Sequence, residues 1–190
     1  MRTAALKNNA RRTVITITKK ITKGKKFEDI FKDSIKQVPN VSIDRIHDQT
    51  TKYKGSKNVS DFIAYKYPRQ YYFECKTTSC TSLSFDNITQ WQDLLEKSRI
   101  HGVVAGVVIW FYAKDVTIFV DIRLLECMRQ EGYKSIAWDC HWLVDDRIAK
   151  WSDYWCHIVG KKKLVYFDYD MDKFFKSLET IYGGEFDECL

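Results

Sequence analysis

Apolar residues recur along the chain with two spacings, one typical of helices and one typical of strands. Phe27, Ile30, Phe31 and Ile35 follow the helical spacing and Pro39 closes the segment, which predicts a helix over residues 24–39. Further helices are predicted, by the same spacing, at 87–100, with Asn87 as a candidate N-cap, at 122–132 and at 171–182.

Strand-forming segments alternate with these helices. They are predicted at 41–48, 59–67, 70–78, 102–111, 115–121 and 162–169. The polar, basic segment 49–58 is predicted to be a loop or protrusion. The aromatic-rich part from residue 133 onward is harder to divide. The resulting order predicts an α/β fold in which helices flank a mixed sheet.

Composition narrows the class of protein. The chain has 190 residues, 45% of them hydrophobic and 15% aromatic, which fits one globular domain over 24–190. No apolar run approaches the roughly 18 residues that span a membrane, and the N-terminus lacks the apolar centre of a signal peptide. We therefore expect a cytoplasmic protein without membrane contact.

Six cysteines occur and none forms a C-x-x-C pair, so we expect reduced thiols. Two Cys-His pairs, Cys140–His141 and Cys156–His157, raise the alternative of zinc. Adjacent residues on a strand point to opposite faces, and zinc ligands usually stand further apart in sequence. The pattern therefore favours core cysteines beside half-buried histidines.

Positive charge is concentrated at the N-terminus. The net charge is +6, and residues 1–26 hold nine Lys or Arg and no acid. A basic arm over 1–23 fits contact with phosphate backbones, although a solvated tail has the same composition. Candidate nucleic-acid-binding residues are Arg11, Arg12, Lys25, Arg45 and Lys54. Arg45 and His47 share one strand face, where a salt bridge is the alternative role.

The stretch "YYFECKTTS", residues 71–79, combines a buried-strand composition with two charges. Side chains alternate along a strand, so Tyr72, Glu74 and Lys76 share one face, and Phe73 and Cys75 share the other.

The preceding strand carries Asp61. If the hairpin turn centres between Tyr67 and Pro68, Asp61 lies opposite Glu74. If Pro68 takes the first central position, Asp61 lies opposite Lys76. These two registers differ by two residues. An intermediate register, slipped by one residue from each, would put Asp61 on the face opposite to Glu74 and Lys76.

Two adjacent carboxylates suit Mg²⁺, which prefers oxygen ligands and keeps several waters. A lysine beside them can position a water or offset charge on a phosphate. Asp61, Glu74 and Lys76 therefore predict a site for phosphodiester hydrolysis. The alternative is a surface salt bridge between Glu74 and Lys76.

The segments "SDFIAY" and "YYFECKTTS" resemble the D…(D/E)xK motif of the PD-(D/E)xK nuclease superfamily. Over residues 24–121 the chain is more closely similar to RecU-type Holliday junction resolvases, especially their compact phage-encoded relatives. "GKKFEDIF" resembles that family's first helix, with its glutamate at Glu28, and "SLSFDNITQWQ" resembles a later segment whose glutamine falls on Gln92. Longer members of that family carry an extended stalk after the first strand, and the corresponding segment here, 49–58, is short.

The resemblance implies a restriction-endonuclease-like core and a homodimer that nicks a four-way DNA junction with Mg²⁺, or with Mn²⁺ in its place. It assigns the metal to Asp61, Glu74 and the Cys75 carbonyl, with Asp48 as an outside candidate. Lys76, Glu28 and Gln92 would assist catalysis. A restriction or repair nuclease of the same superfamily, or a nucleic-acid-binding protein without catalysis, are the alternatives.

Overall fold

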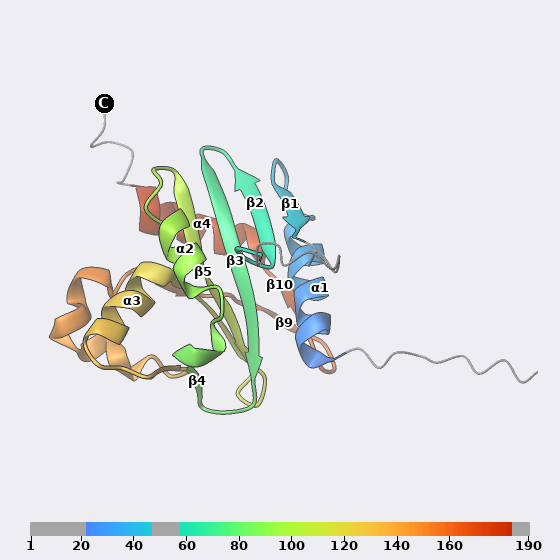
Figure 1. Cartoon of the computed structure of the whole chain (residues 1–190). Helices are drawn as coiled ribbons and strands as arrows, with labels where there is room; N and C mark the ends of the chain where they lie inside the picture. The colour runs from blue at the N-terminus through green and yellow to red at the C-terminus, as the bar shows by residue number, and fades with distance from the viewer. Residues whose placement is uncertain (1–21, 47–57, 184–190) are drawn as a thin grey trace, which may run out of the picture.

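A mixed sheet forms the centre of the protein (Figure 1). The computed structural model describes residues 22–46 and 58–183. Within them, six strands pair in the order β1-β2-β3-β5-β6-β8. Their bounds are β1 Ser42–Arg45, β2 Phe62–Lys66, β3 Arg69–Thr78, β5 Val103–Phe111, β6 Val116–Asp121 and β8 Trp155–His157. Only β3 and β5 pair in parallel, and the other neighbours are antiparallel. A parallel pair needs a long crossover, which the chain between Thr78 and Val103 supplies.

Helices cover both faces of this sheet. Helices α1 (Lys23–Ile35) and α4 (Met171–Tyr182) bury aromatic side chains against one face, together with Phe73 of β3. Helices α2 (Trp91–Lys97) and α3 (Ile122–Gln130) pack on the other face, against Val107 of β5. Figure 1 shows α2 in front of the sheet and α4 behind it. The predicted α/β class, a mixed sheet flanked by helices, is confirmed.

Several element boundaries differ from the predictions. The helix predicted at 87–100 is shorter, because Phe85–Asn87 forms a 3-10 turn and α2 begins only at Trp91, with Gln90 rather than Asn87 as its N-cap residue. The strand predicted at 162–169 was wrong. That segment contributes to a hairpin of β9 (Gly160–Lys162) and β10 (Phe167–Tyr169).

The β2–β3 hairpin adopts one of the two predicted registers that bring Asp61 and Glu74 together. Lys66 pairs with Arg69 and Phe62 pairs with Phe73, so the turn consists of Tyr67 and Pro68. Continuing this register by one residue places Asp61 opposite Glu74. Pro68 therefore occupies the second central position of the turn and not the first.

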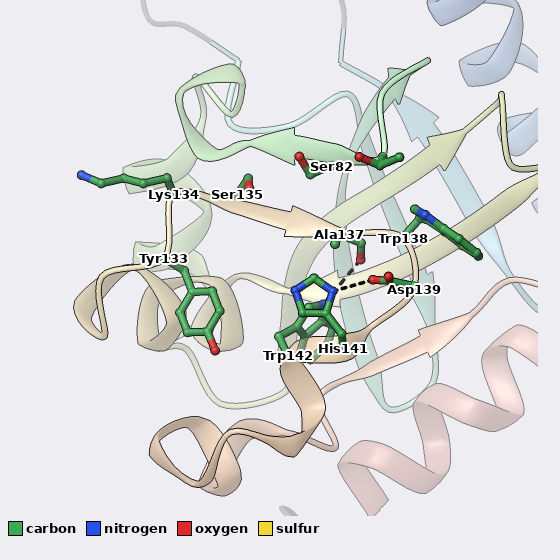
Figure 2. Close-up of a pocket in the computed structure, with 10 residues that line it drawn as sticks. Ser82, Tyr133, Lys134, Ser135, Ala137, Trp138, Asp139, His141 and Trp142 are labelled. Carbon is green, nitrogen blue, oxygen red and sulfur yellow. Dashed lines mark hydrogen bonds and ion pairs between the residues drawn. The ribbon is translucent and has the colours of Figure 1, made fainter.

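The C-terminal third builds part of the same structure. β7 (Ser135–Ala137) pairs with the short β4 (Ser82–Ser84), and the chain then turns beneath this pair into the 3-10 helix η2, His141–Val144 (Figure 2). A further 3-10 helix, η3, spans Asp146–Trp151 and leads into β8.

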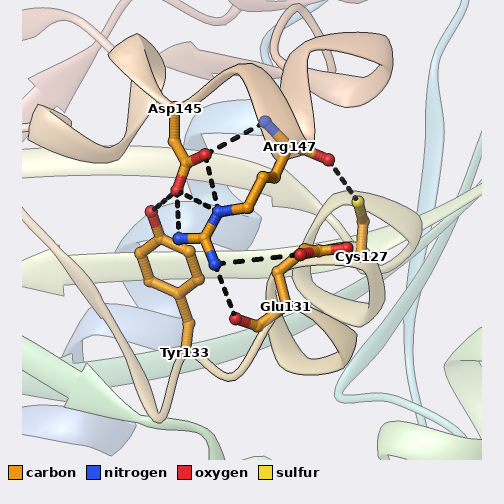
Figure 3. Close-up of polar contacts among 5 residues, drawn as sticks. All are labelled: Cys127, Glu131, Tyr133, Asp145 and Arg147. Atoms are coloured by element: carbon orange, nitrogen blue, oxygen red, sulfur yellow. Dashed lines mark hydrogen bonds and ion pairs between the residues drawn. The ribbon is translucent and has the colours of Figure 1, made fainter.

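A charge cluster fastens this segment to α3 (Figure 3). Asp145 accepts hydrogen bonds from the Tyr133 hydroxyl and from the Arg147 guanidinium, which also donates to the Glu131 carbonyl at 3.3 Å. These contacts hold the pKa of Asp145 well below its usual range.

Helix α4 is fixed at its C-terminal end by a buried polar contact. The Tyr182 hydroxyl donates to Asp121 Oδ2 at 2.6 Å, and Asp121 is fully buried. Arg123 donates to the same carboxylate at 3.0 Å, so the buried charge is paired. No helix in the two described ranges is long and apolar enough to cross a bilayer.

The glycine in the middle of β5 provides a test of this packing. A Cβ on Gly106 would lie 2.5 Å from the Phe119 ring and 2.5 Å from the Val120 carbonyl oxygen. Because one of these neighbours is backbone, Gly106→Ala is expected to lower the free energy of unfolding by about 3 kcal/mol. Chemical denaturation measures this. Gly183→Ala, with nothing within 4 Å of its new Cβ, is the control. Equal stability of the two variants would contradict the packing described.

Candidate active site

The charged face of β3 is buried. Glu74 is only 1% exposed, and its Oε1 lies 2.7 Å from the Lys76 ammonium nitrogen. The second carboxylate oxygen, Oε2, is buried without a hydrogen-bond partner. Burial, followed by the charge of Asp61, raises the pKa of Glu74 to about 7, and Lys76 only partly offsets this. The contact between Glu74 and Lys76 is thus not the surface salt bridge that the sequence also allowed.

Asp61 directly precedes β2 and is tied to β3 by its side chain. The backbone N–H of Cys75 donates to Asp61 Oδ2 at 2.8 Å, and the Asp61 carbonyl accepts from the N–H of Ile46. These contacts fix the carboxylate where the sheet register directs it, beside Glu74. The Cys75 thiol lies on the opposite face, in the core with Phe73, so only the backbone of Cys75 belongs to the site.

A pocket of about 420 Å³ opens at Asp61 and extends to the N-terminus of α1. It is lined by Thr22, Gly24, Lys25, Glu28, Arg45, Ile46, Asn58, Asp61 and Gln90. The fold therefore brings Glu28 and Asp61, from segments more than 30 positions apart, to one cavity. Glu74 and Lys76 do not line it, and they join the site through Asp61.

Glu28 and Arg45 form an ion pair in this pocket, and each side chain is 20% exposed. Arg45 also lies 3.1 Å from Asp29. Arg45 is thus engaged in the salt bridge that the sequence offered as the alternative to a phosphate contact. Glu28 reaches the pocket from the second turn of α1.

The glutamine in the pocket is Gln90, which sequence reasoning missed, and not Gln92. Gln92 is exposed on α2, whereas Gln90 precedes the helix and lines the cavity with Asp61. On a helix, Gln90 and Gln92 lie at about 100° to either side of Trp91, so the spacing from Trp91 alone does not choose between them. The choice depends on where the helix starts.

Of the candidate nucleic-acid-binding residues, Lys25 and Arg45 lie within the described residues. Lys25 is exposed at the rim of the pocket. Arg11, Arg12, His47, Asp48 and Lys54 lie outside the described residues. Asn58, beside the second undescribed segment, was not singled out from the sequence and lines the pocket, where its side-chain amide donates to the Ile46 carbonyl at 3.3 Å.

The chemistry of the site fits a hard divalent cation. No group of three or more His, Cys, Asp or Glu side chains that could hold a metal lies within the described parts of the chain. The pair of carboxylates does fit, because Glu74 presents a buried oxygen without a partner next to the charge of Asp61. Mg²⁺ needs few protein ligands, since it keeps waters and takes other oxygens from phosphate.

The two Cys-His pairs lie elsewhere. His141 is exposed beside a pocket near β7, where its Nδ1 lies 2.7 Å from Asp139 Oδ1 (Figure 2). His157 is exposed on β8. The prediction of a half-buried histidine is wrong for His141, whose side chain is 68% exposed. It holds better for His157, because burial lowers the pKa of that imidazole. Burial also raises the pKa of both Cys140 and Cys156 to about 12.

No protein-family model and no curated protein matches the chain. Among solved structures, it is similar to Hjc of Archaeoglobus fulgidus, a Holliday junction resolvase from an archaeal hyperthermophile. The match has 18% identity and a TM-score of 0.45, over 60% of this chain and 88% of that chain. At this level of similarity it assigns no activity to the chain.

The burial of Glu74 has a consequence for stability. A carboxyl whose pKa is raised on folding stabilises the native state below the unfolded-state pKa, and this contribution is lost as pH rises through the native pKa. Here the range runs from about 4.5 to about 7. Each pH unit is worth ~1.4 kcal/mol, so Glu74→Gln should gain about 2–3 kcal/mol relative to wild type between pH 5 and 8.5.

Urea denaturation in EDTA at both pH values measures this difference. Glu96→Gln, an exposed glutamate on α2, is the control and should show no such gain. Parallel pH profiles for Glu74→Gln and wild type would mean that Glu74 is not buried as described.

Proposed function

We propose that the protein is a Mg²⁺-dependent endonuclease that cleaves branched DNA. The proposal rests on one observation: the β2–β3 hairpin places the Asp61 carboxylate beside Glu74, and Lys76 Nζ lies 2.7 Å from Glu74 Oε1. Two carboxylates and a lysine, in this order on a hairpin, form the D…(D/E)xK pattern of the PD-(D/E)xK nucleases. The finer assignment is a RecU-type resolvase that acts on four-way junctions as a homodimer.

Each side chain has a part in the proposed reaction. Asp61 and Glu74 would hold Mg²⁺, with the Cys75 carbonyl as a further ligand. When bound, Mg²⁺ supplies a Lewis acid for the phosphate and a water of lowered pKa. Lys76 would offset negative charge on the phosphate oxygens as one P–O bond forms and another breaks. Glu28 and Gln90 would orient the attacking water from the pocket wall.

DNA binding would come from other residues. Lys25 at the pocket rim and the basic arm over 1–23, with Arg11 and Arg12, would contact phosphates, which give affinity without sequence preference. A homodimer with two such sites would nick opposed strands of a junction. A different PD-(D/E)xK nuclease remains the second candidate, since the catalytic residues are shared and only the substrate differs.

The catalytic assignment is tested on a panel of four-way junction, Y-fork, linear duplex and single strand. Wild type should cleave the junction with Mg²⁺ or Mn²⁺ but not with EDTA, and Ca²⁺ should support binding alone. Asp61→Asn, Glu74→Gln and Lys76→Ala should each lower cleavage at least 100-fold and retain junction binding. The asparagine of Asp61→Asn keeps an oxygen that can accept from the Cys75 N–H, so loss of activity in this variant would result from the missing negative charge.

Lys173→Ala, an exposed lysine of α4, and Glu96→Gln are the controls and should cleave like wild type. Substantial cleavage by both Lys76→Ala and Glu74→Gln would place the active site elsewhere. Efficient cutting of linear duplex in preference to the junction would favour the second candidate function.

The pocket geometry distinguishes the two glutamines. Gln90→Ala should lower the cleavage rate by about tenfold, because it removes a polar group that lines the same pocket as Asp61. Gln92→Ala, on the exposed side of α2, should leave the rate unchanged. Single-turnover cleavage of the junction at saturating enzyme measures both. The reverse result would support the residue assigned from the sequence.

A further inference from the structure

The hairpin of β9 and β10 has an unusual turn. Lys162 pairs with Phe167, and the Lys163 N–H donates to the Tyr166 carbonyl, which leaves Leu164 and Val165 as the two central residues. Such positions usually hold Gly, Asn, Asp or Pro. Here Leu164 is 100% exposed and Val165 is 55% exposed. Two adjacent aliphatic side chains thus stand at the turn, with Leu164 fully exposed and Val165 about half exposed to solvent.

The base of the hairpin is firmly held, so the turn projects from a rigid support. Tyr169 is buried and its hydroxyl lies 2.9 Å from Thr117 Oγ1. The Asp170 N–H donates to the Val159 carbonyl at 2.9 Å, and Tyr166 packs against Trp110. The two strands also approach so closely that a Cβ on Gly160 would lie 2.6 Å from the Asp168 carbonyl oxygen.

Three lysines stand on the strand that leads into the apolar turn. Lys161, Lys162 and Lys163 directly precede Leu164, and all three are exposed. Lys162 pairs with Asp115, and Lys163 lies 3.1 Å from Asp168. Both pairs are between exposed side chains, which stabilise the fold little and can be exchanged for phosphate contacts.

A path of lysines joins this hairpin to the candidate active site. Lys25 lines the pocket that contains Asp61, and the next residue, Lys26, lines a groove of about 430 Å³ between α1 and the hairpin turn. These two residues lie on different sides of α1, so the pocket and the groove flank one helix. A helix with its side chains is about 10–12 Å wide. A DNA duplex across the N-terminal turn of α1 would reach both.

We propose that the β9–β10 hairpin is a DNA-opening wedge. Leu164 and Val165 insert at a base step of the bound DNA, and Lys161, Lys162 and Lys163 contact the flanking phosphates. Proteins that bind and kink DNA in the minor groove frequently insert apolar side chains such as Leu between base steps, with basic side chains contacting the groove. A protein partner fits less well, because lysine is depleted at protein interfaces. The inference rests on the proposed function only in taking DNA as the ligand.

The test uses a four-way junction with 2-aminopurine, a base whose fluorescence rises on unstacking, at single positions near the branch. In EDTA, wild type should raise the fluorescence at one or two positions severalfold. The Leu164→Ser/Val165→Ser double variant should lose this rise. Val144→Ser, an 89% exposed residue of η2, is the matched control and should behave as wild type. The tip is exposed, so the double variant is expected to fold.

Charge is tested separately. Replacing Lys161, Lys162 and Lys163 with glutamine should weaken junction binding and lower the salt slope by about 2–3, since each phosphate contact contributes ~0.9. An unchanged slope would overturn the phosphate contacts. A fluorescence rise in the Leu164→Ser/Val165→Ser variant equal to that of wild type would overturn the wedge proposal. Failure of wild type to bind the junction would overturn it as well. So would selective loss of binding to vesicles of phosphatidylserine and phosphatidylcholine in that variant, which would indicate a membrane contact.

Cleavage with Mg²⁺ separates the wedge from the nuclease proposal. If wild type cuts the junction, and the Leu164→Ser/Val165→Ser variant unstacks it as strongly as wild type does, the wedge proposal fails and the nuclease proposal stands. If wild type unstacks the junction through Leu164 and Val165 without cutting it, the wedge stands and the nuclease fails.

Discussion

The hydrogen bond from the Cys75 N–H to Asp61 Oδ2 is the contact on which the geometry of the proposed active site depends. β2 begins only at Phe62, so the Asp61 side chain continues the pairing with β3 where the backbone ladder stops. It thereby holds a carboxylate beside Glu74. A slip of the hairpin by one residue would turn Asp61 to the opposite face, toward the aromatic core under α1.

The second constraint is the burial of Glu74. An unpaired carboxylate oxygen in the interior costs free energy, and one lysine only partly compensates for it. An apolar residue would suit this position in a central strand better. The cost is understandable if a cation occupies the site when the protein works, because the cation then completes the contacts of both carboxylates. Stability is thus given up at the position where the proposed reaction takes place.

Much of this arrangement is predictable from the sequence, and the limits have physical causes. The alternation along residues 70–78 identifies the charged face of β3, and the motif order points to Asp61, Glu74, Lys76 and Glu28. The sequence does not choose between the two hairpin registers, because Pro68 can take either central position of the turn.

Gln90 was missed because the start of α2 depends on tertiary packing of Trp91 and not on local spacing. The strand predicted at 162–169 failed because its turn consists of Leu164 and Val165, which carry no turn signal. That departure from local rules is itself the strongest indication that the hairpin has a function beyond the fold.

The central claim is that Asp61 and Glu74 together hold a divalent cation. The most direct measurement is an anomalous difference map from crystals grown with Mn²⁺, for wild type and Glu74→Gln. We expect one strong peak in contact with both carboxylates in wild type, and loss of that peak in the variant. Absence of a peak at these residues in wild type, or an unchanged peak in Glu74→Gln, would contradict the account.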